Sequence, residues 1–397
     1  MPITPASASP PNAPVNHIVV LMQENRSYDS YFGQLHFEGQ VNSPPEPVKG
    51  NPNPVIGTGP PIKPFHKASY CETADLNHSW LGTHLEINNG SMNGFTTQNV
   101  DPTDPTGSRA MGYYNNSDLQ YYYALANAFG IGDRYFASVP GPTFPNRFYL
   151  LAGTSFGHIQ NDFPPPGGWT QPTVFRSLTN AGVSWKVYYS QLPFAALFAD
   201  VQQHPQNLAP ISQYFADAKA GHLPQVAFVD PTFIAGVNIE TDEHPPSNIQ
   251  VGEAFSAQVV NALLASPNWP DSAMFLTYDE HGGFYDHVAP PAAPVPDNIP
   301  PPVGSGPYTF NMYGVRVPVT VISPYAIAHH VDHTVYDHTS ILRFIELRFG
   351  LSALTNRDAS ANPMLGFFDF SHPDLLTPPS LPPAPIDPTH AAQCATR

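Results

Sequence analysis

The chain has 397 residues, and 15 basic against 31 acidic residues give it a net charge of −16. This length allows a sizeable hydrophobic core, while the acidic balance argues against nucleic acid and strongly anionic lipid as partners. A metal ion or a substrate with a cationic head group is compatible with this charge.

The 49 prolines gather in four runs, which indicate how the chain is organised. Residues 1–16 and 372–397 are predicted to be proline-rich tails, and residues 43–64 and 289–307 are predicted surface insertions. Residues 17–371 are predicted to form a single large domain, because acidic residues far apart in the sequence would have to meet in it.

Two further sequence features concern the compartment of the protein. The opening MPITPASAS lacks the basic start and apolar centre of a signal peptide, and no apolar stretch is long enough to span a bilayer. Cys71 and Cys394 are too few and too far apart in sequence to predict a disulfide framework. The compartment therefore stays open.

Short apolar runs predict core strands, and segments with helical spacing lie between them. The strands are predicted at residues 17–22, 185–189, 225–229, 273–278 and 315–322, and the helices at residues 117–129, 247–265 and 339–349. This alternation predicts an α/β fold with a mainly parallel central sheet flanked by helices. In such folds the ligand site lies beyond the carboxyl ends of the strands.

Polar residues follow several of the predicted strands. Glu24 and Asn25 follow the first strand, Asp230 follows QVAFV, and Asp279 and Glu280 follow AMFLTY. Their oxygen atoms suit a divalent cation, with zinc or calcium the leading choices. The alternative is that each acid caps a helix or pairs with an arginine. Two clusters of the same kind at strand ends favour the metal.

Thr143 lies in SVPGPTFPNRFYLLAG, where glycine and proline predict a tight turn before a helix. It is either a plain helix cap or a nucleophile whose phosphorylated product would lie at a helix N-terminus. Arg26 and Arg147 either hold phosphate oxygens or brace loops through ion pairs.

Five segments together resemble the motifs of one phosphoesterase family. They are VVLMQENRSYDSYFG, PGPTFPNR, TDEHPPSNIQVGEAF, TYDEHGGFYDHVAPP and YGVRVPVTVISPYA, and YDHTSILRFIELRFG extends the match. The family contains bacterial and plant non-specific phospholipases C and acid phosphatase A. The resemblance implies a fold like that of the alkaline phosphatase superfamily, and metal-assisted attack on phosphorus by a side-chain hydroxyl.

Carried over by position, the resemblance implies a set of site residues. Glu24, Asn25, Asp279 and Glu280 would be metal ligands, and Thr143 would be the nucleophile. The phospholipase C branch has threonine at this position, whereas the acid phosphatase has serine. Larger bacterial relatives carry an export signal and C-terminal β-domains, and family members are often secreted.

Histidine is the usual proton donor near neutral pH, and the chain has 17 histidines. His78 and His244 lie in segments that resemble family active-site motifs and are our catalytic candidates. His281 and His287 are candidates for ligands or for supporting residues. Which histidine acts as the general acid stays open.

The leading functional hypothesis is a metal-dependent phospholipase C that converts phosphatidylcholine into diacylglycerol and phosphocholine through a phosphothreonine intermediate. The alternatives are an acid phosphatase that acts on monoesters, or a catalytically silent protein that binds phospholipid or phosphate. The expected partners are a phospholipid or small phosphate ester, with transient membrane or micelle contact. The oligomeric state is not predicted.

Overall fold

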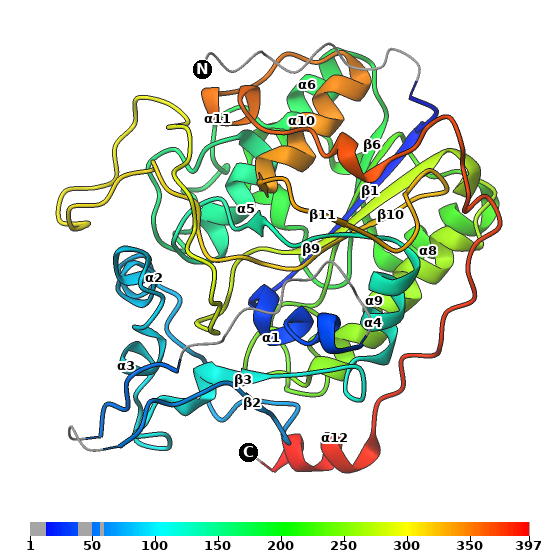
Figure 1. Ribbon diagram of the computed structural model, residues 1–397. Coiled ribbons are helices and arrows are strands. Elements are labelled where there is room, and N and C mark those ends of the chain that lie inside the picture. The colour runs from blue at the N-terminus through cyan, green and yellow to red at the C-terminus, as the bar shows by residue number, and fades with distance from the viewer. Residues whose placement is uncertain (1–12, 39–49, 56–58, 397) are drawn as a thin grey trace.

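The computed structural model describes residues 13–38, 50–55 and 59–396, and its centre is a β-sheet covered by helices on both faces (Figure 1). The strands of this sheet are β1 His17–Gln23, β4 Gly130–Gly132, β6 Trp185–Tyr189, β7 Leu208–Pro210, β8 Val226–Asp230, β9 Ser272–Tyr278, β10 Val319–Ile322 and β11 His330–Asp332. Across the described residues they lie in the order β11-β4-β10-β9-β1-β8-β6-β7.

Most neighbouring strands in the sheet are parallel, which confirms the predicted α/β fold. β9, β1, β8, β6 and β7 run in one direction, whereas β10 is antiparallel to both β9 and β4. Two short parallel pairs lie outside this sheet. They are β2 Phe65–His66 with β3 Gly112–Tyr113, and β5 Tyr135–Phe136 with β12 Tyr336–Asp337.

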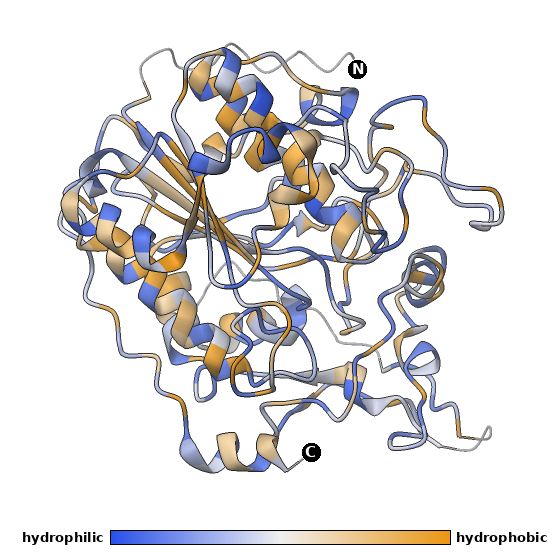
Figure 2. Ribbon diagram, turned by 180° about the vertical axis from the view of Figure 1, so that it is seen from behind, coloured by the Kyte–Doolittle hydropathy of each residue, from blue (hydrophilic) through white to orange (hydrophobic). Residues whose placement is uncertain are grey.

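Helices cover both faces of the sheet, and further helices lie outside these two layers. Their bounds are α1 Tyr28–Phe32, α2 Trp80–Ile87, α3 Phe95–Gln98, α4 Gln120–Ala128, α5 Thr143–Ala152, α6 Val174–Asn180, α7 Ala199–Gln202, α8 Ile211–Ala220, α9 Ile249–Leu264, α10 His338–Phe349, α11 Asn356–Ala359 and α12 Pro388–Ala395. In Figure 1, α5, α6 and α10 lie on one face, and α4, α8 and α9 lie on the other. Figure 2 shows the apolar strands between these layers.

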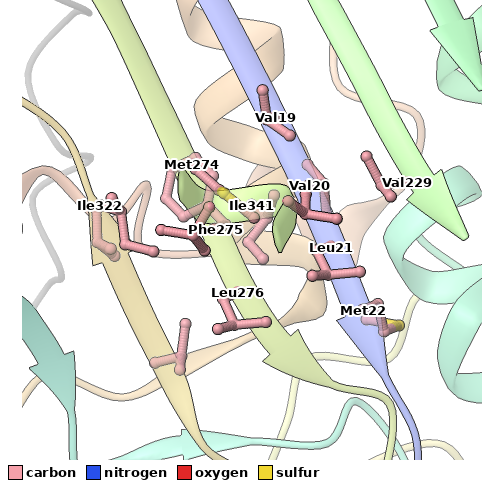
Figure 3. Close-up of a cluster of buried hydrophobic side chains, with 14 of the residues drawn as sticks. Val19, Val20, Leu21, Met22, Val229, Met274, Phe275, Leu276, Ile322 and Ile341 are labelled. Carbon is pink, nitrogen blue, oxygen red and sulfur yellow. The ribbon is translucent and has the colours of Figure 1, made fainter. Parts of the chain in front are cut away.

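The central strand β1 is apolar along its length because helices cover both of its faces. Val19 and Leu21 are fully buried, and Figure 3 shows them beside Phe275 of β9 and Ile341 of α10. Burying a side chain of this size contributes about 1.5–3 kcal/mol to stability. β1 and β9 are in register up to their last pair, Gln23 opposite Tyr278, so the two strands end side by side. The residues that follow them therefore start from the same edge of the sheet.

The predicted domain boundaries and insertions stay predictions. Residues 1–12 of the predicted N-terminal tail and parts of the insertion at 43–64 lie outside the described residues. The described segment 289–307 runs along the surface without a helix or a named strand, and its Val303 is exposed. In the described ranges, no helix is both long and apolar enough to cross a membrane.

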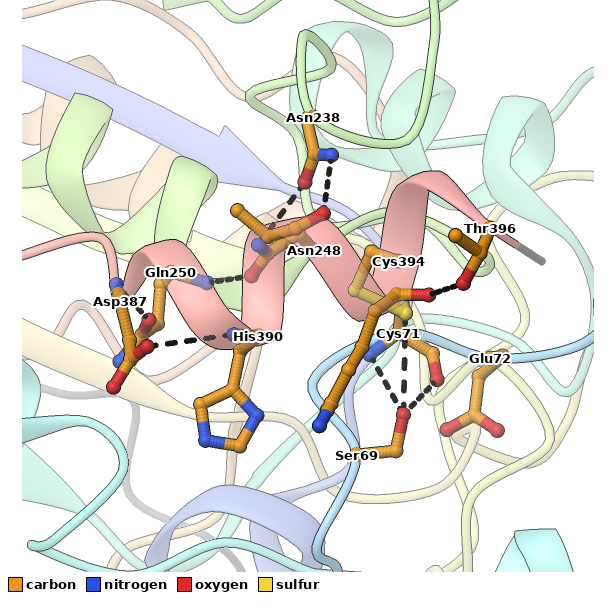
Figure 4. Close-up of a disulfide and its surroundings, with 12 residues drawn as sticks. Ser69, Cys71, Glu72, Asn238, Asn248, Gln250, Asp387, His390, Cys394 and Thr396 are labelled. Carbon is orange, nitrogen blue, oxygen red and sulfur yellow. Dashed lines mark hydrogen bonds between the residues drawn. A yellow bond between two sulfur atoms is a disulfide. The ribbon is translucent and has the colours of Figure 1, made fainter.

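A disulfide joins Cys71 to Cys394 across 323 residues of sequence and anchors α12 (Figure 4). The expectation that these cysteines lie too far apart in sequence to be bridged was wrong. The C-terminal segment crosses the molecule and returns α12 to the segment before α2. Asn238 donates a hydrogen bond to the Ala391 carbonyl at 2.8 Å, and the His390 ring stacks on Tyr70 at 3.8 Å. The helix therefore contacts two separate loops.

Reduction of this disulfide is expected to lower the melting temperature clearly. Closing a loop of this length destabilises the unfolded chain by about 5.8 kcal/mol in the chain-entropy treatment. Thermal unfolding of the Cys71→Ser/Cys394→Ser variant, compared with wild type under oxidising and reducing conditions, measures the effect. If reduction left the wild-type melting temperature unchanged, the disulfide would not contribute to stability.

Glu253 of α9 is a buried carboxyl group whose ionisation is expected to oppose folding. Its Oε1 accepts hydrogen bonds from the backbone N–H groups of Tyr121 at 2.9 Å and Tyr122 at 3.1 Å, and burial raises its pKa from 4.5 to about 8. Because the folded-state pKa lies above the unfolded one, its contribution to stability is present below pH 4.5 and is lost as pH rises through 8.

Glu253→Gln should therefore unfold at a higher temperature than wild type near pH 8, with the advantage shrinking toward pH 4.5. The difference is at most about 1.4 kcal/mol per pH unit in this window. Calorimetry of both proteins across the window tests it. A constant difference at every pH would show that Glu253 titrates alike in both states.

Candidate active site

The two polar clusters predicted at strand ends lie together beyond the paired ends of β1 and β9. The backbone N–H of Asn25 donates to Asp279 Oδ1 at 3.1 Å, and the N–H of Asp279 donates to the Gln23 carbonyl at 3.1 Å. Asn25 has a φ of 62°, so the chain turns sharply after Glu24. Gly282 packs so closely on this turn that a Cβ atom would lie 2.6 Å from Asn25 Cβ. This close packing holds the two clusters against each other.

Asp242 joins this group from the loop between β8 and α9. Its carbonyl accepts a hydrogen bond from the N–H of Glu24 at 2.7 Å, and its side chain is fully buried. Burial and the negative charge of Glu24 raise the pKa of Asp242 well above its ordinary value. Burial and Glu24 likewise raise the pKa of Asp279. Three acidic side chains therefore repel one another in a water-poor environment.

These acids fit a divalent cation by an observation independent of any family resemblance. Oδ2 of Asp279 and Oδ2 of Asp242 are buried and have no hydrogen-bond partner among the described residues. Buried carboxylate oxygens are costly unless they are paired or coordinate a metal. Hard oxygen donors suit calcium, and zinc also accepts carboxylates. Glu24, Asp242 and Asp279 thus offer oxygen donors of the kind that such an ion binds.

Arg147 of α5 supplies the positive charge that these acids face in the protein itself. Its Nη2 lies 2.9 Å from Glu24 Oε1, and its other nitrogens lie 3.9 Å from Asp230 Oδ1 and 3.7 Å from Asp279 Oδ2. Its guanidinium is buried and stacks over the Phe194 ring. This geometry matches the ion-pair reading of Arg147. One guanidinium shared by three carboxylates leaves the group short of positive charge.

Glu280 differs from the other predicted ligands because the protein already pairs both of its oxygens. Oε1 lies 2.7 Å from His78 Nδ1, and Oε2 accepts the N–H of Gly282 at 2.7 Å and lies 3.3 Å from His281 Nδ1. Burial opposes ionisation, but the positive charges of His78 and His281 outweigh it and lower the pKa of Glu280 to about 2. Glu280 is therefore a stable anion between two histidines.

His78 and His244, predicted as catalytic candidates, lie close together. Their ring centroids are 5.7 Å apart, and Asp75 Oδ2 lies 3.1 Å from His78 Nε2 and 3.8 Å from His244 Nε2. Ligand atoms of these three residues lie within 4.8 Å of one another, a spacing that also suits a metal. Although burial disfavours the cation, Glu280 and Asp75 raise the pKa of His78 well above its ordinary value. The two acids therefore favour the protonated form of His78.

The side-chain amide of Asn25 links the carboxylates to the histidines. When its nitrogen faces the carboxylates, it donates to Asp279 Oδ1 at 3.2 Å and to Glu280 Oε1 at 2.7 Å. Its oxygen then accepts from His244 Nε2 at 2.9 Å. Asn25 is thus well placed to orient both halves of the site.

Thr143 is the first residue of α5, as the turn signals predicted. The helix has no side-chain cap, and among the described residues the Thr143 hydroxyl makes no hydrogen bond. Asn146 fixes the preceding turn by bonding the carbonyls of Val139, Gly141 and Pro142. Thr143 and Arg147 are four residues apart on α5 and share a helix face, so Thr143 lies one turn from the side chain that binds Glu24. This arrangement does not support the plain-cap interpretation.

A cavity of about 500 Å³ opens beside these residues. It is lined by His78, by Pro142 immediately before Thr143, by Trp80 and Leu81 of α2, and by Gly304, among others. The wall is partly apolar and also carries polar side chains, among them those of His78 and Asn161. A cavity of this size accommodates a small ester or one part of a larger substrate.

The remaining candidates lie in supporting positions. His281 Nε2 bonds Glu86 at 2.8 Å, and the two facing acids raise the pKa of His281 to about 9 against the effect of burial. His287 contacts Asp29 at 2.6 Å in a separate network whose acids Arg316 also binds. Arg26 donates to the Asn25 carbonyl at 2.8 Å and lies over the Phe284 ring, which matches the loop-bracing reading.

Sequence reasoning missed Asp75 and Asp242. Both stand close in sequence to a predicted histidine, Asp75 before His78 and Asp242 before His244. That proximity was the available signal, but neither acid follows a strand directly.

Comparisons with known proteins agree with the sequence resemblance. The profile of the phosphoesterase family matches residues 15–352. The chain is 33% identical to phospholipase C B of Mycobacterium tuberculosis over 423 residues, covering 92% of this chain and 80% of that protein. It is 32% identical to non-specific phospholipase C1 of Arabidopsis thaliana over 390 residues, covering 89% and 71%.

Among solved structures, a protein in the alkaline phosphatase superfamily from Vibrio parahaemolyticus aligns with a TM-score of 0.43 at 9% identity. The alignment covers 88% of this chain and 69% of that one. A score at this level carries no argument about the site.

Proposed function

The chain belongs to the phosphoesterase family and is a phosphoric-ester hydrolase, and we propose that it acts as a metal-dependent phospholipase C. Phosphatidylcholine is the proposed substrate, and diacylglycerol and phosphocholine are the products. The observation that carries the proposal is the pair of buried oxygens on Asp242 and Asp279 that lack a hydrogen-bond partner among the described residues. The names of the similar proteins support the choice of a phospholipid.

Glu24, Asn25, Asp279 and Glu280 are the ligands that the resemblance implies, and Asp242 joins them in this proposal on the evidence of its unpaired oxygen. When bound, a divalent ion supplies positive charge that lowers the pKa of a nearby hydroxyl and offsets the charge of the phosphoryl oxygens. Zinc and calcium are both compatible with this donor set.

In the first step the ionised oxygen of Thr143 attacks phosphorus, and the bond from phosphorus to the diacylglycerol oxygen breaks. The departing alkoxide takes a proton from His78, whose cation Glu280 and Asp75 hold beside the cavity. Diacylglycerol leaves, and phosphocholine stays esterified to Thr143. The N-terminal backbone N–H groups of α5 favour this anion.

In the second step water attacks phosphorus and gives its proton to His78, and the Thr143 oxygen leaves. Phosphocholine departs, and the enzyme returns to its starting protonation state. His244 acts as a positioning residue in this scheme, because its Nε2 donates to the Asn25 amide oxygen at 2.9 Å.

The disulfide bears on the compartment, and we propose that the protein works in an oxidising one. Disulfides persist in exported proteins and are rarely kept in reducing cytosol. Thiol alkylation of protein taken directly from its native cells tests this, since Cys71 and Cys394 should resist labelling until a reductant is added. Free thiols in that protein would contradict the proposal.

A substrate panel tests the proposed function. With dispersed phosphatidylcholine, phosphatidylglycerol and a simple phosphomonoester at equal concentration, we expect phosphocholine release from phosphatidylcholine to be fastest. The net charge of −16 disfavours anionic lipid, and Thr143 matches the phospholipase C branch. Rapid release of inorganic phosphate from the monoester, without diester turnover, would indicate that the protein is an acid phosphatase and not a phospholipase C. Binding of the lipids without any turnover would indicate a catalytically silent member.

A further inference from the structure

A buried acid behind the site has no role in the scheme above. Glu243 lies between Asp242 and His244 in sequence, and its side chain is fully buried and bonded to the Tyr31 hydroxyl. It has a φ of 74°, which is uncommon for a residue other than glycine. The local backbone therefore adopts a conformation that the surroundings must stabilise.

Hydrogen-bond donors surround this carboxylate. Oε2 accepts from the Tyr31 hydroxyl at 2.5 Å and from the Tyr278 hydroxyl at 3.0 Å. Oε1 accepts from the Tyr122 hydroxyl and lies 3.4 Å from the Gln23 amide nitrogen. Four donors on two oxygens favour glutamate over glutamine at this position, because a carboxylate accepts on both oxygens and an amide on only one.

The donors come from the segments that carry the proposed site residues. Gln23 immediately precedes Glu24, Tyr278 immediately precedes Asp279, and the two donors are paired across β1 and β9. Successive side chains on a strand point to opposite faces. Gln23 and Tyr278 thus bind Glu243 on one face of the sheet, while the residues that follow them, Glu24 and Asp279, lead into the site.

Tyr31 connects the Glu243 carboxylate to the turn that carries Glu24 and Asn25. Its hydroxyl accepts from Arg26 Nε at 3.1 Å, and Arg26 Nη1 donates to the Asn25 carbonyl at 2.8 Å. The chain of contacts runs from Glu243 through Tyr31 and Arg26 to Asn25, whose backbone is left-handed.

The backbone of α9 packs closely against this side chain. A Cβ on Gly252 of α9 would lie 2.1 Å from Glu243 Cγ, so the helix approaches the acid as closely as glycine allows. Gln23 also donates to the Thr241 carbonyl at 2.8 Å, which fixes the start of the loop that carries Asp242.

We propose that Glu243 is the positioning residue of this active site. It ties the ends of β1 and β9 to the Asp242–His244 loop and so sets the separation of the carboxylates that would hold the metal. The inference rests on the proposed function, since a positioning residue needs a site to position.

The main test compares Glu243→Gln with Glu253→Gln. Both replace a buried carboxyl group on or beside α9 by an amide, but Oε1 of Glu253 accepts from the N–H groups at the start of α4 and, among the described residues, from no residue of the site. We expect Glu243→Gln to lower kcat at least tenfold and to weaken binding of calcium or zinc, measured by calorimetry on the metal-free protein, to a similar degree. Glu253→Gln should match wild type in both.

A second comparison applies even if Glu243→Gln fails to fold. Tyr278→Phe and Tyr122→Phe each remove one hydrogen bond from the same carboxylate, but only Tyr278 adjoins a proposed ligand. Tyr278→Phe should therefore reduce kcat and metal affinity several-fold more than Tyr122→Phe, although the two lose similar stability.

Two outcomes would overturn the inference. If wild type is active and Glu243→Gln, or Tyr278→Phe, changes only the melting temperature, Glu243 has a structural role alone and the proposed function stands. If wild type hydrolyses no phosphate ester, the proposed function fails and this inference fails with it.

Discussion

Thr143→Ala is expected to lose turnover by about three orders of magnitude or more, because the attacking oxygen is removed. Thr143→Ser should retain a measurable fraction, since its hydroxyl survives without the methyl group that restricts its rotation. Steady-state kinetics on dispersed phosphatidylcholine measure both variants. The melting temperature of Thr143→Ala should change little, because the hydroxyl makes no capping bond in α5.

Thr173→Ala is the matched control for this experiment. Thr173 is a buried threonine at the start of α6, and its hydroxyl donates to Asp200 at 2.8 Å. Its loss should lower stability by about 1 kcal/mol and leave the kinetics normal. If Thr143→Ala instead behaved like Thr173→Ala, Thr143 would be an ordinary structural threonine and the covalent mechanism would be wrong.

Complete removal of bound metal is expected to abolish activity and to change stability in a way that depends on Asp279. With metal at about one hundred times its dissociation constant, the native protein gains about 2.7 kcal/mol. Asp279→Asn should lose most of that gain. Without metal it should be more stable than wild type, because repulsion with the buried Glu24 is relieved. Thermal unfolding with and without calcium or zinc measures both effects.

Asp217→Asn provides the control for charge removal at a distance. Asp217 of α8 pairs with Lys186 at 2.6 Å and contacts none of the proposed ligands among the described residues. It should keep its activity and its response to metal. Full activity in exhaustively demetallated wild-type protein would contradict the metal-dependent scheme.

The site residues that could be predicted from the sequence are those that come directly after strands. β1 and β9 are mainly apolar runs. Glu24 is the first residue after β1, and Asp279 is the first residue after β9. Parallel neighbouring strands bring such residues to one edge of the sheet. β6 was predicted with its observed bounds, and the other predicted core strands overlap β1, β8, β9 and β10.

Other features depend on contacts that local sequence does not encode. The antiparallel direction of β10 follows from the path of a long irregular segment before it. Asp242 reaches Glu24 through a loop with an uncommon backbone conformation at Glu243. Glu280 looked equivalent to Asp279, but the histidines that pair with it come from distant positions or from a turn. The disulfide likewise required the full course of the chain.

The stereochemical course at phosphorus tests the account most directly. Each in-line displacement inverts phosphorus, so attack by Thr143 followed by attack by water restores the original configuration, whereas direct attack by water inverts it. A phosphorothioate analogue of phosphatidylcholine with known configuration, hydrolysed in isotopically labelled water, distinguishes these courses. Attack by Thr143 predicts net retention in the released phosphocholine analogue, and net inversion would contradict the covalent mechanism.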